Sequence, residues 1–344
     1  MSTGLRERIR TGGVFLRRRL AALPLRAKLT AAAMLLLVAA LFGPQWNTTR
    51  PAFDYVVTLD VSQSMNVRDY ELDGAPASRL AYTKHMLRQT LAELPCGSRI
   101  GWAVFAEYRV LLLVAPAEVC DNYNDLLATL ERIDGRMSWA GASEVAKGLY
   151  WGLRTVKELG GNHGIAFFTD GHEAPPVSPL HIPVYDGKPG EVRGIVVGVG
   201  GDALMPIPKT DPEGHSLGFW GPDEVMQTDG YSAGRTGSTT GEGLVDESGK
   251  EEKRMKPTMT EHLSSLKGAY LQALARDTAL SYHRLAGQPE LLRALTAPHL
   301  ARPAPYRADV RVLLAGAALA LLVAAHLPVL RQPARLLRRR LKPQ

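Results

Sequence analysis

Residues 52–64 read AFDYVVTLDVSQS, an apolar run of strand length that ends in a carboxylate and two hydroxyls. The run predicts a buried strand, and Asp60, Ser62 and Ser64 at its end form the pattern D-x-S-x-S. In an open α/β sheet, ligands bind beyond the carboxyl ends of the strands. Carboxylate and hydroxyl oxygens suit hard divalent cations, which include Mg²⁺, Mn²⁺ and Ca²⁺. The stretch therefore predicts a parallel sheet with a candidate metal site at its carboxyl edge.

The chain around this stretch alternates between strand and helix patterns. Runs such as 164–170 (GIAFFTD) and 193–200 (RGIVVGVG) predict further buried parallel strands, whereas 99–107 and 109–116 are nearly contiguous and predict an antiparallel hairpin. Apolar residues at helical spacing predict helices over 78–94 (with Ser78 as N-cap), 121–134, 143–159, 260–278 and 289–295, and a short strand is expected over 280–285. The expected fold is a doubly wound, mostly parallel α/β sheet with one antiparallel edge strand.

Two further segments place oxygen donors at the same sheet edge. Asp170 follows the apolar run 164–169, and Ser143 is at the start of the predicted helix 143–159. Three segments in this order strengthen the prediction of a metal site made by Asp60, Ser62, Ser64, Ser143 and Asp170. His172, two residues after Asp170, is expected to be a solvent-exposed loop residue.

Other chemistries find weaker support. A P-loop needs G-x-x-x-x-G-K, which does not occur, and a serine hydrolase elbow G-x-S-x-G is also missing. A dehalogenase-type phosphotransferase would need a carboxylate in place of Ser62. Gly198-x-Gly200-x-x-Ala203 imitates a dinucleotide fingerprint, but Pro206 and Pro208 break any helix after it. Because no general acid–base pair is evident, we expect binding without turnover.

The basic residues are concentrated at the two ends of the chain. The formal net charge is +7, yet residues 1–28 hold eight basic residues and one acidic residue, and 331–344 hold six basic residues and no acidic one. Between them lie 27 basic and 33 acidic residues, a net charge of −6. This distribution argues against a nucleic-acid-binding protein.

Each basic end adjoins an uncharged apolar run. We expect transmembrane helices over 29–46 and 309–330, because about 20 apolar residues cross a bilayer. The flanking arginines and lysines place residues 1–28 and 331–344 in the cytoplasm, so that 47–308 is a periplasmic domain of an inner-membrane protein. A cleaved signal peptide is the alternative for the first run.

Two local features complete the organisation. Residues 202–258 are rich in Gly, Pro, Ser, Thr and charge, and they predict an exposed insertion. The hairpin should bring Cys96 and Cys120 together at the end of the sheet opposite the metal site. In an oxidising periplasm a Cys96–Cys120 disulfide is expected, with two free thiols as the alternative.

The three oxygen-bearing segments resemble the metal-ion-dependent adhesion site of von Willebrand factor A (vWA) domains over roughly residues 52–300. The resemblance implies that Asp60, Ser62, Ser64, Ser143 and Asp170 bind a divalent metal ion, either Mg²⁺ or Ca²⁺ with Mn²⁺ as a further candidate. Ser143 stands where the family usually has threonine. In the family, a carboxylate of a partner protein completes the metal's coordination.

Several stretches resemble one subgroup of membrane-anchored vWA proteins in particular. These include 94–98 (LPCGS), 133–140 (IDGRMSWA) and 143–150 (SEVAKGLY), and they are similar to the MxaL group of methanol dehydrogenase gene clusters. The resemblance implies a non-enzymatic accessory role in Ca²⁺ insertion into methanol dehydrogenase or in its maturation, with that enzyme or its accessory proteins as partners. The alternative is a Bat-type envelope stress or assembly factor that works with a MoxR-type AAA ATPase.

Overall fold

The computed structural model describes residues 24–178, 181–228 and 259–327. Its centre is a six-stranded sheet with the order β13-β8-β7-β2-β5-β6. All neighbouring pairs are parallel except β5 and β6. The strands are β2 (Asp54–Asp60), β5 (Arg99–Ala106), β6 (Arg109–Glu118), β7 (Gly164–Thr169), β8 (Gly194–Gly198) and β13 (Ser281–Arg284). The predicted mostly parallel sheet with one antiparallel edge strand is confirmed.

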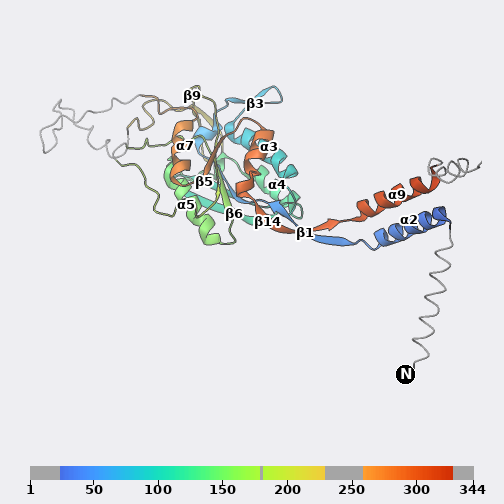
Figure 1. The fold of residues 1–344 in the computed structure, drawn as a ribbon. Helices are drawn as coiled ribbons and strands as arrows, with labels where there is room; N and C mark the ends of the chain where they lie inside the picture. The colour runs from blue at the N-terminus through green and yellow to red at the C-terminus, as the bar shows by residue number, and fades with distance from the viewer. Residues whose placement is uncertain (1–23, 179–180, 229–258, 328–344) are drawn as a thin grey trace, which may run out of the picture. The chain divides into compact units, whose positions relative to one another are not determined.

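Helices cover both faces of this sheet (Figure 1). One face packs against α3 (Arg79–Glu93), α4 (Tyr123–Arg132) and α8 (Gln288–Leu295). The other packs against α5 (Val145–Leu159) and α7 (Gly268–Asp277). Successive residues of β2 alternate between the two cores, with Val57 and Leu59 in the first and Val56 in the second. Burial on both faces explains why these strands are continuous apolar runs.

Most of the predicted elements agree with the structure, and one helix needs correction. Ser78 caps α3 as predicted, since its Oγ accepts a hydrogen bond from the Ala81 amide at 3.1 Å. The helix expected over 260–278 is confined to Gly268–Asp277, because Leu263–Ser264 (β12) pairs with Met205–Pro206 (β9). Within the described part of the insertion, Pro208–Thr210 (β10) pairs with Ser216–Phe219 (β11). Residues 229–258 of the predicted insertion lie outside the described residues.

Short elements near the metal-site loops complete the domain. A 3₁₀ turn, η1 (Gln63–Asn66), follows β2, and a small hairpin of β3 (Tyr70–Leu72) and β4 (Ala75–Ala77) precedes α3. Two further 3₁₀ turns are η2 (Gly135–Met137) and η3 (Pro298–Leu300).

The apolar segments at the two ends form a separate compact unit. Helix α2 (Leu25–Leu41) lies against α9 (Arg311–His326), and β1 (Gln45–Ala52) pairs with β14 (Arg302–Asp309). The two helices differ from the predicted spans 29–46 and 309–330, because α2 covers Leu25–Leu41 and α9 begins at Arg311. Helix α2 stops before Gly43, whose φ is +59°, and Pro44, which lacks an amide hydrogen. Residues 328–330 lie outside the described residues.

Within the part of the chain that the structure describes, none of the helices combines the length and the apolar character needed to cross a membrane.

A disulfide joins Cys96 to Cys120, with Cα atoms 5.3 Å apart. Cys96 lies just before β5 and Cys120 just after β6. Because Asp54, at the start of β2, is in register with Arg99 of β5, the disulfide lies at the amino end of β2. Asp60 lies at the other end of that strand, so the disulfide and the candidate metal site occupy opposite ends of the sheet.

Candidate metal centre

The three predicted segments meet at the carboxyl edge of the sheet. Asp60 is the last residue of β2, and Asp170 follows the last residue of the neighbouring strand β7. Ser62 and Ser64 lie in the turn after β2, where their hydroxyls are 3.1 Å apart. Ser143 lies two residues before α5 and lines the same cavity as the two serines. The structure therefore brings all five predicted residues to one edge.

Hydrogen bonds from the neighbouring chain fix the carboxylate of Asp60. Its Oδ1 accepts the Ser62 amide at 2.9 Å, and its Oδ2 accepts the Thr169 hydroxyl at 2.6 Å. Thr169 in turn accepts the Gly171 amide at 3.0 Å. Gly171 has φ +78°, a conformation that favours glycine and turns the chain back toward the site. The T-D-G sequence thus links both carboxylate-bearing strands.

Ser143 is held by backbone contacts on both sides. Its amide donates to the Ala174 carbonyl, and the Ala174 amide donates back to the Ser143 carbonyl, both at 2.7 Å. The carboxylate of Glu173 accepts the amides of Val145 and Ala146, each at 3.0 Å, at the start of α5. Glu173 therefore caps α5 from a distant loop and fixes the backbone around Ser143.

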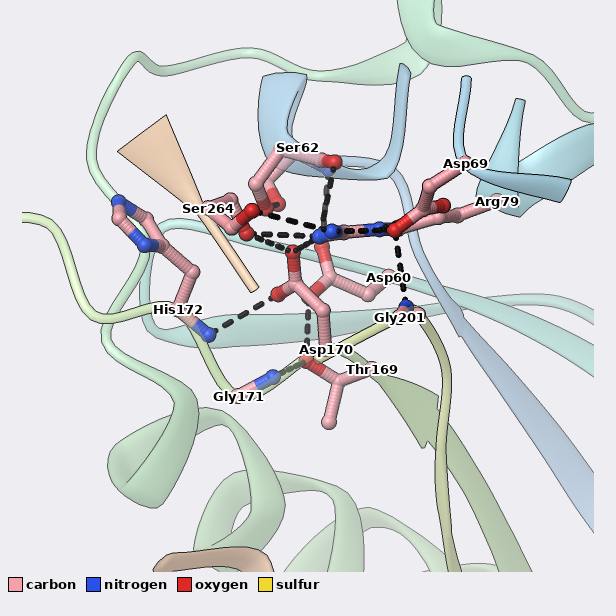
Figure 2. Close-up of polar contacts among 12 residues, drawn as sticks. Asp60, Ser62, Asp69, Arg79, Thr169, Asp170, Gly171, His172, Gly201 and Ser264 are labelled. Carbon is pink, nitrogen blue, oxygen red and sulfur yellow. Dashed lines mark hydrogen bonds and ion pairs between the residues drawn. The ribbon is translucent and has the colours of Figure 1, made fainter. Parts of the chain in front are cut away.

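A fully buried arginine, Arg79, neutralises part of the negative charge. Figure 2 shows its guanidinium between Asp69 and Asp170, and Nη1 lies 2.6 Å from Asp170 Oδ2. Nη2 lies 2.7 Å from Asp69 Oδ2, and Nη1 also donates to Ser264 Oγ at 2.6 Å. Ser264 donates to the same Asp170 oxygen at 2.9 Å. Asp170 thus already has a positive partner, so it is fixed in place as an anion.

The two site carboxylates differ in pKa because only one has a cationic neighbour. Burial, and then the charge of Asp170, raises the pKa of Asp60 to about 7. Burial opposes ionisation of Asp170 too, but the charge of Arg79 outweighs it and lowers the pKa of that carboxyl. Among the described residues Asp60 makes no ion pair, and a bound cation would favour its charged form.

The three site serines line a cavity of about 290 Å³. Ser62, Ser64 and Ser143 are only 6, 3 and 2% exposed, so the cavity is the approach to their hydroxyls. The Ser143 hydroxyl is buried and has no hydrogen-bond partner in the described chain. A buried hydroxyl without a hydrogen-bond partner lowers the stability of the folded protein, and coordination to a bound cation would give this hydroxyl a partner.

These observations fit a hard divalent cation. Asp60 would supply the charged ligand, and the hydroxyls of Ser62, Ser64 and Ser143 would supply neutral oxygen ligands. Asp170, bonded to Arg79 and Ser264, would contribute charge from the adjacent strand. Few direct carboxylates imply a modest affinity.

Sequence reasoning missed Arg79 and Ser264 and misplaced His172. Arg79 is the first residue of α3, where a cation is unfavourable beside the helix dipole, and that anomaly was the available signal. His172 is 3% exposed, contrary to the expected surface position. Its Nδ1 has no partner in the described chain, and burial lowers its pKa, so the ring is neutral at pH 7.

Comparison with known families identifies the domain. Residues 55–172 match the von Willebrand factor type A domain, and this segment runs from β2 through His172. It therefore includes all five predicted site residues. Within residues 55–172 the chain is similar to vWA domains. Comparison with curated proteins gave no match.

Solved structures with a similar architecture have low sequence identity to this chain. An aerotolerance-related membrane protein from Bacteroides fragilis is 16% identical with a TM-score of 0.43, over 71% of this chain and 96% of that one. BatB from Bacteroides thetaiotaomicron gives the same values. An uncharacterised membrane-spanning protein from Vibrio fischeri is also 16% identical, with a TM-score of 0.26, over 70% and 93%.

Proposed function

We propose that this protein is a non-enzymatic docking module whose vWA domain binds a divalent cation and, through it, a carboxylate of a client protein. The unpaired, buried hydroxyl of Ser143 is the observation that carries this proposal. It lies at one cavity with Ser62 and Ser64, beside a buried carboxylate that has no cationic partner in the described chain. A cation at this position satisfies both groups and keeps one coordination position for the client. Mg²⁺ and Ca²⁺ are the favoured ions, and Mn²⁺ is a useful probe.

The favoured client is periplasmic methanol dehydrogenase or one of its accessory proteins. Support comes from the stretches 94–98, 133–140 and 143–150, which resemble the MxaL group. In this role the protein assists Ca²⁺ insertion into the enzyme or its maturation, and the bound cation serves as the docking contact. A Bat-type role in envelope assembly would use the same site on a different client.

We further propose that the two ends of the chain attach the domain to the inner membrane, with the vWA domain in the periplasm and both termini in the cytoplasm. The support is the sequence: residues 29–46 and 312–330 are uncharged, and their outer flanks are basic. In the structure, α2 and α9 expose large apolar side chains, including Met34 and Leu35 at 70% each and Leu313 at 72%. Recovery of the full chain in the membrane fraction after carbonate extraction tests this attachment.

The test of client docking is an affinity pull-down from native membranes of a methanol-oxidising bacterium, with Ca²⁺ or Mg²⁺ present. Wild type is compared with Asp60→Asn and Ser143→Ala. Thr90→Val is the matched control, because Thr90 on α3 carries another buried hydroxyl without a partner, away from the site. Asp170 is a poor target, since its loss would leave Arg79 with one anion fewer in a buried position.

We expect methanol dehydrogenase subunits or accessory proteins to be captured by wild type and Thr90→Val and lost with the two site variants. Equal capture by all four proteins would contradict docking through this site. Metal-dependent capture of an envelope protein or an ATPase-linked complex instead would replace the methanol dehydrogenase role with the Bat-type one.

A further inference from the structure

The insertion forms one wall of the cavity beside the candidate metal centre. Residues on that side of the cavity include Ile207, Trp220, Val225 and Met226. Trp220 is held from two directions: its indole Nε1 donates to Gln63 Oε1 at 2.8 Å, and its amide donates to the Ile207 carbonyl at 3.0 Å. Gln63 lies between Ser62 and Ser64 in sequence. The insertion is therefore hydrogen-bonded to the loop that carries two of the site serines.

The cavity has a polar side and an apolar side. The polar side carries the hydroxyls of Ser62, Ser64 and Ser143 together with His172, and two of its buried atoms, Ser143 Oγ and His172 Nδ1, have no partner in the described chain. Apolar side chains of the insertion, Ile207, Val225 and Met226, line the same cavity together with Pro175. A ligand that satisfies both sides has a polar head and a short apolar body.

The size of the cavity restricts what can reach the serines. At about 290 Å³ it is at the lower limit of small-molecule sites. Because the serine hydroxyls lie beneath this cavity, a flat protein surface cannot contact them. A small acid can enter, and so can one residue that protrudes from a larger chain.

Acidic residues at the cavity make binding dependent on the cation. Glu261 lines the cavity, and Glu224 does so while paired with Lys209. Glu173 is a third carboxyl group at the cavity, and it caps α5. These groups oppose a second anion unless a positive charge is present. A carboxylate ligand would therefore bind only to the metal-loaded protein.

We propose that this cavity selects a carboxylate that is attached to a short apolar group of about four to six carbons. The carboxylate would face the cation and the serines, and the apolar group would pack on Ile207, Trp220 and Met226. The proposal rests on the proposed function, because it requires the cation at Asp60 and Ser143. The shared ligand chemistry has two sources, a free short-chain acid or an apolar residue at the carboxyl terminus of a client chain.

The test is calorimetric titration of the full chain in detergent, first with Mn²⁺ and then with acetate, butyrate and hexanoate. Each methylene that enters an apolar site strengthens binding by up to about fourfold. We expect hexanoate to bind at least roughly tenfold more tightly than acetate to the Mn²⁺-loaded protein, and neither acid to bind after EDTA treatment. 1-Hexanol, which lacks the carboxylate, should not bind.

Substitutions in the insertion separate selectivity from metal binding. Trp220→Ala should reduce the preference for hexanoate to about threefold or less, and this ratio is measured at saturating Mn²⁺ because Trp220 also bonds Gln63 in the metal-site loop. Met226→Gln is a milder second variant, since Met226 is already 46% exposed and its replacement does not threaten folding. Leu217→Ala is the control, because Leu217 belongs to the same insertion, is 58% exposed and does not line the cavity.

The outcomes distinguish this inference from the function on which it rests. If wild type binds no Mn²⁺, the proposed function fails. If Mn²⁺ binds but acetate and hexanoate bind equally, or if Trp220→Ala leaves their ratio unchanged, the cavity proposal alone is overturned. A tetrapeptide that ends in leucine is the remaining probe. If it binds more tightly than hexanoate, and if the same peptide with an amidated carboxyl terminus does not bind, a protein terminus is the source. Weaker binding of the peptide identifies a free acid.

Discussion

At the residue scale, the site depends on a division of roles between two buried carboxylates. Asp170 is neutralised internally by Arg79, whereas Asp60 has hydrogen bonds from Ser62 and Thr169 but no cation in the described chain. The same edge of the sheet therefore holds one carboxylate that organises the protein and another that is left for a metal. This distinction decides which substitutions report on function and which report on folding.

The Arg79–Asp170 pair should be required for stability without metal. We expect Asp170→Ala or Arg79→Met to lower the free energy of unfolding by about 3–5 kcal/mol, because each leaves a buried charge with fewer partners. The loss of unfolding free energy in the double variant should be smaller than the sum of the losses in the two single variants. Urea denaturation in EDTA measures all three.

The matched control for this prediction is Arg88→Met. Arg88 is on the same helix and pairs with Glu131 at 3.0 Å, but both side chains are about half exposed. Its loss should cost at most about 1 kcal/mol. If substitutions in the buried pair lower the free energy of unfolding by as little as Arg88→Met does, Arg79 is not the group that stabilises Asp170.

At the element scale, the start of α5 controls the position of Ser143. The helix has no side-chain cap of its own, and the carboxyl group of Glu173, 28 residues further along the chain, accepts the amide of Val145 instead. Burial raises the pKa of Glu173 to about 7, so at neutral pH it retains part of a proton that an exposed glutamate would lose. This contact makes the stability of the element depend on pH.

Because the pKa of Glu173 is higher in the folded state, its contribution to stability is complete at acidic pH and is lost as the pH rises through about 7. We expect wild type to lose up to about 3 kcal/mol between pH 4.5 and 8 relative to Glu173→Gln, which cannot titrate. Urea denaturation across this range in EDTA measures the difference. Glu158→Gln, an exposed position on α5, should follow wild type. If the unfolding free energies of wild type and Glu173→Gln change with pH in the same way, Glu173 is not the group responsible for the pH dependence.

The disulfide constrains the elements at the opposite end of the sheet. Cys96 and Cys120 enclose β5 and β6 with a sequence separation of 24. Replacing both with serine should lower the free energy of unfolding by about 3 kcal/mol. The metal affinity should be unchanged, because β2 separates the bridge from Asp60 by about 20 Å. A loss of metal binding in this variant, measured by calorimetry, would contradict the independence of the two ends.

At the scale of the whole molecule, the sequence predicts the sheet well because its signals are local and repeated. The apolar runs at β2, β7 and β8 and the adjacent pair β5–β6 are enough to derive a mostly parallel sheet with an antiparallel edge. The carboxyl-edge rule then places Asp60 and Asp170 together. Apolar periodicity defines most of the helices, and Ser78 marks the start of α3.

The features that the sequence does not reveal depend on contacts between distant segments. Ser264, which follows the insertion in the sequence, accepts a hydrogen bond from Arg79, and Trp220 within the insertion donates one to Gln63. The pairing of β12 with β9 shortens the helix expected over 260–278. His172 is also buried, although its loop position had led us to expect it at the surface. None of these contacts leaves a periodic pattern in the sequence.

The most direct test of the central claim is calorimetric titration of Mn²⁺ into wild type, Ser143→Ala and Thr90→Val, with unfolding free energies measured in EDTA for each. Both substitutions remove an unpaired buried hydroxyl, so neither should destabilise the metal-free protein. We predict one Mn²⁺ per chain for wild type and Thr90→Val, and at least about tenfold weaker binding for Ser143→Ala, the loss of roughly 1.4 kcal/mol. Equal Mn²⁺ affinity in all three proteins would contradict a cation held by Ser143 at this edge of the sheet.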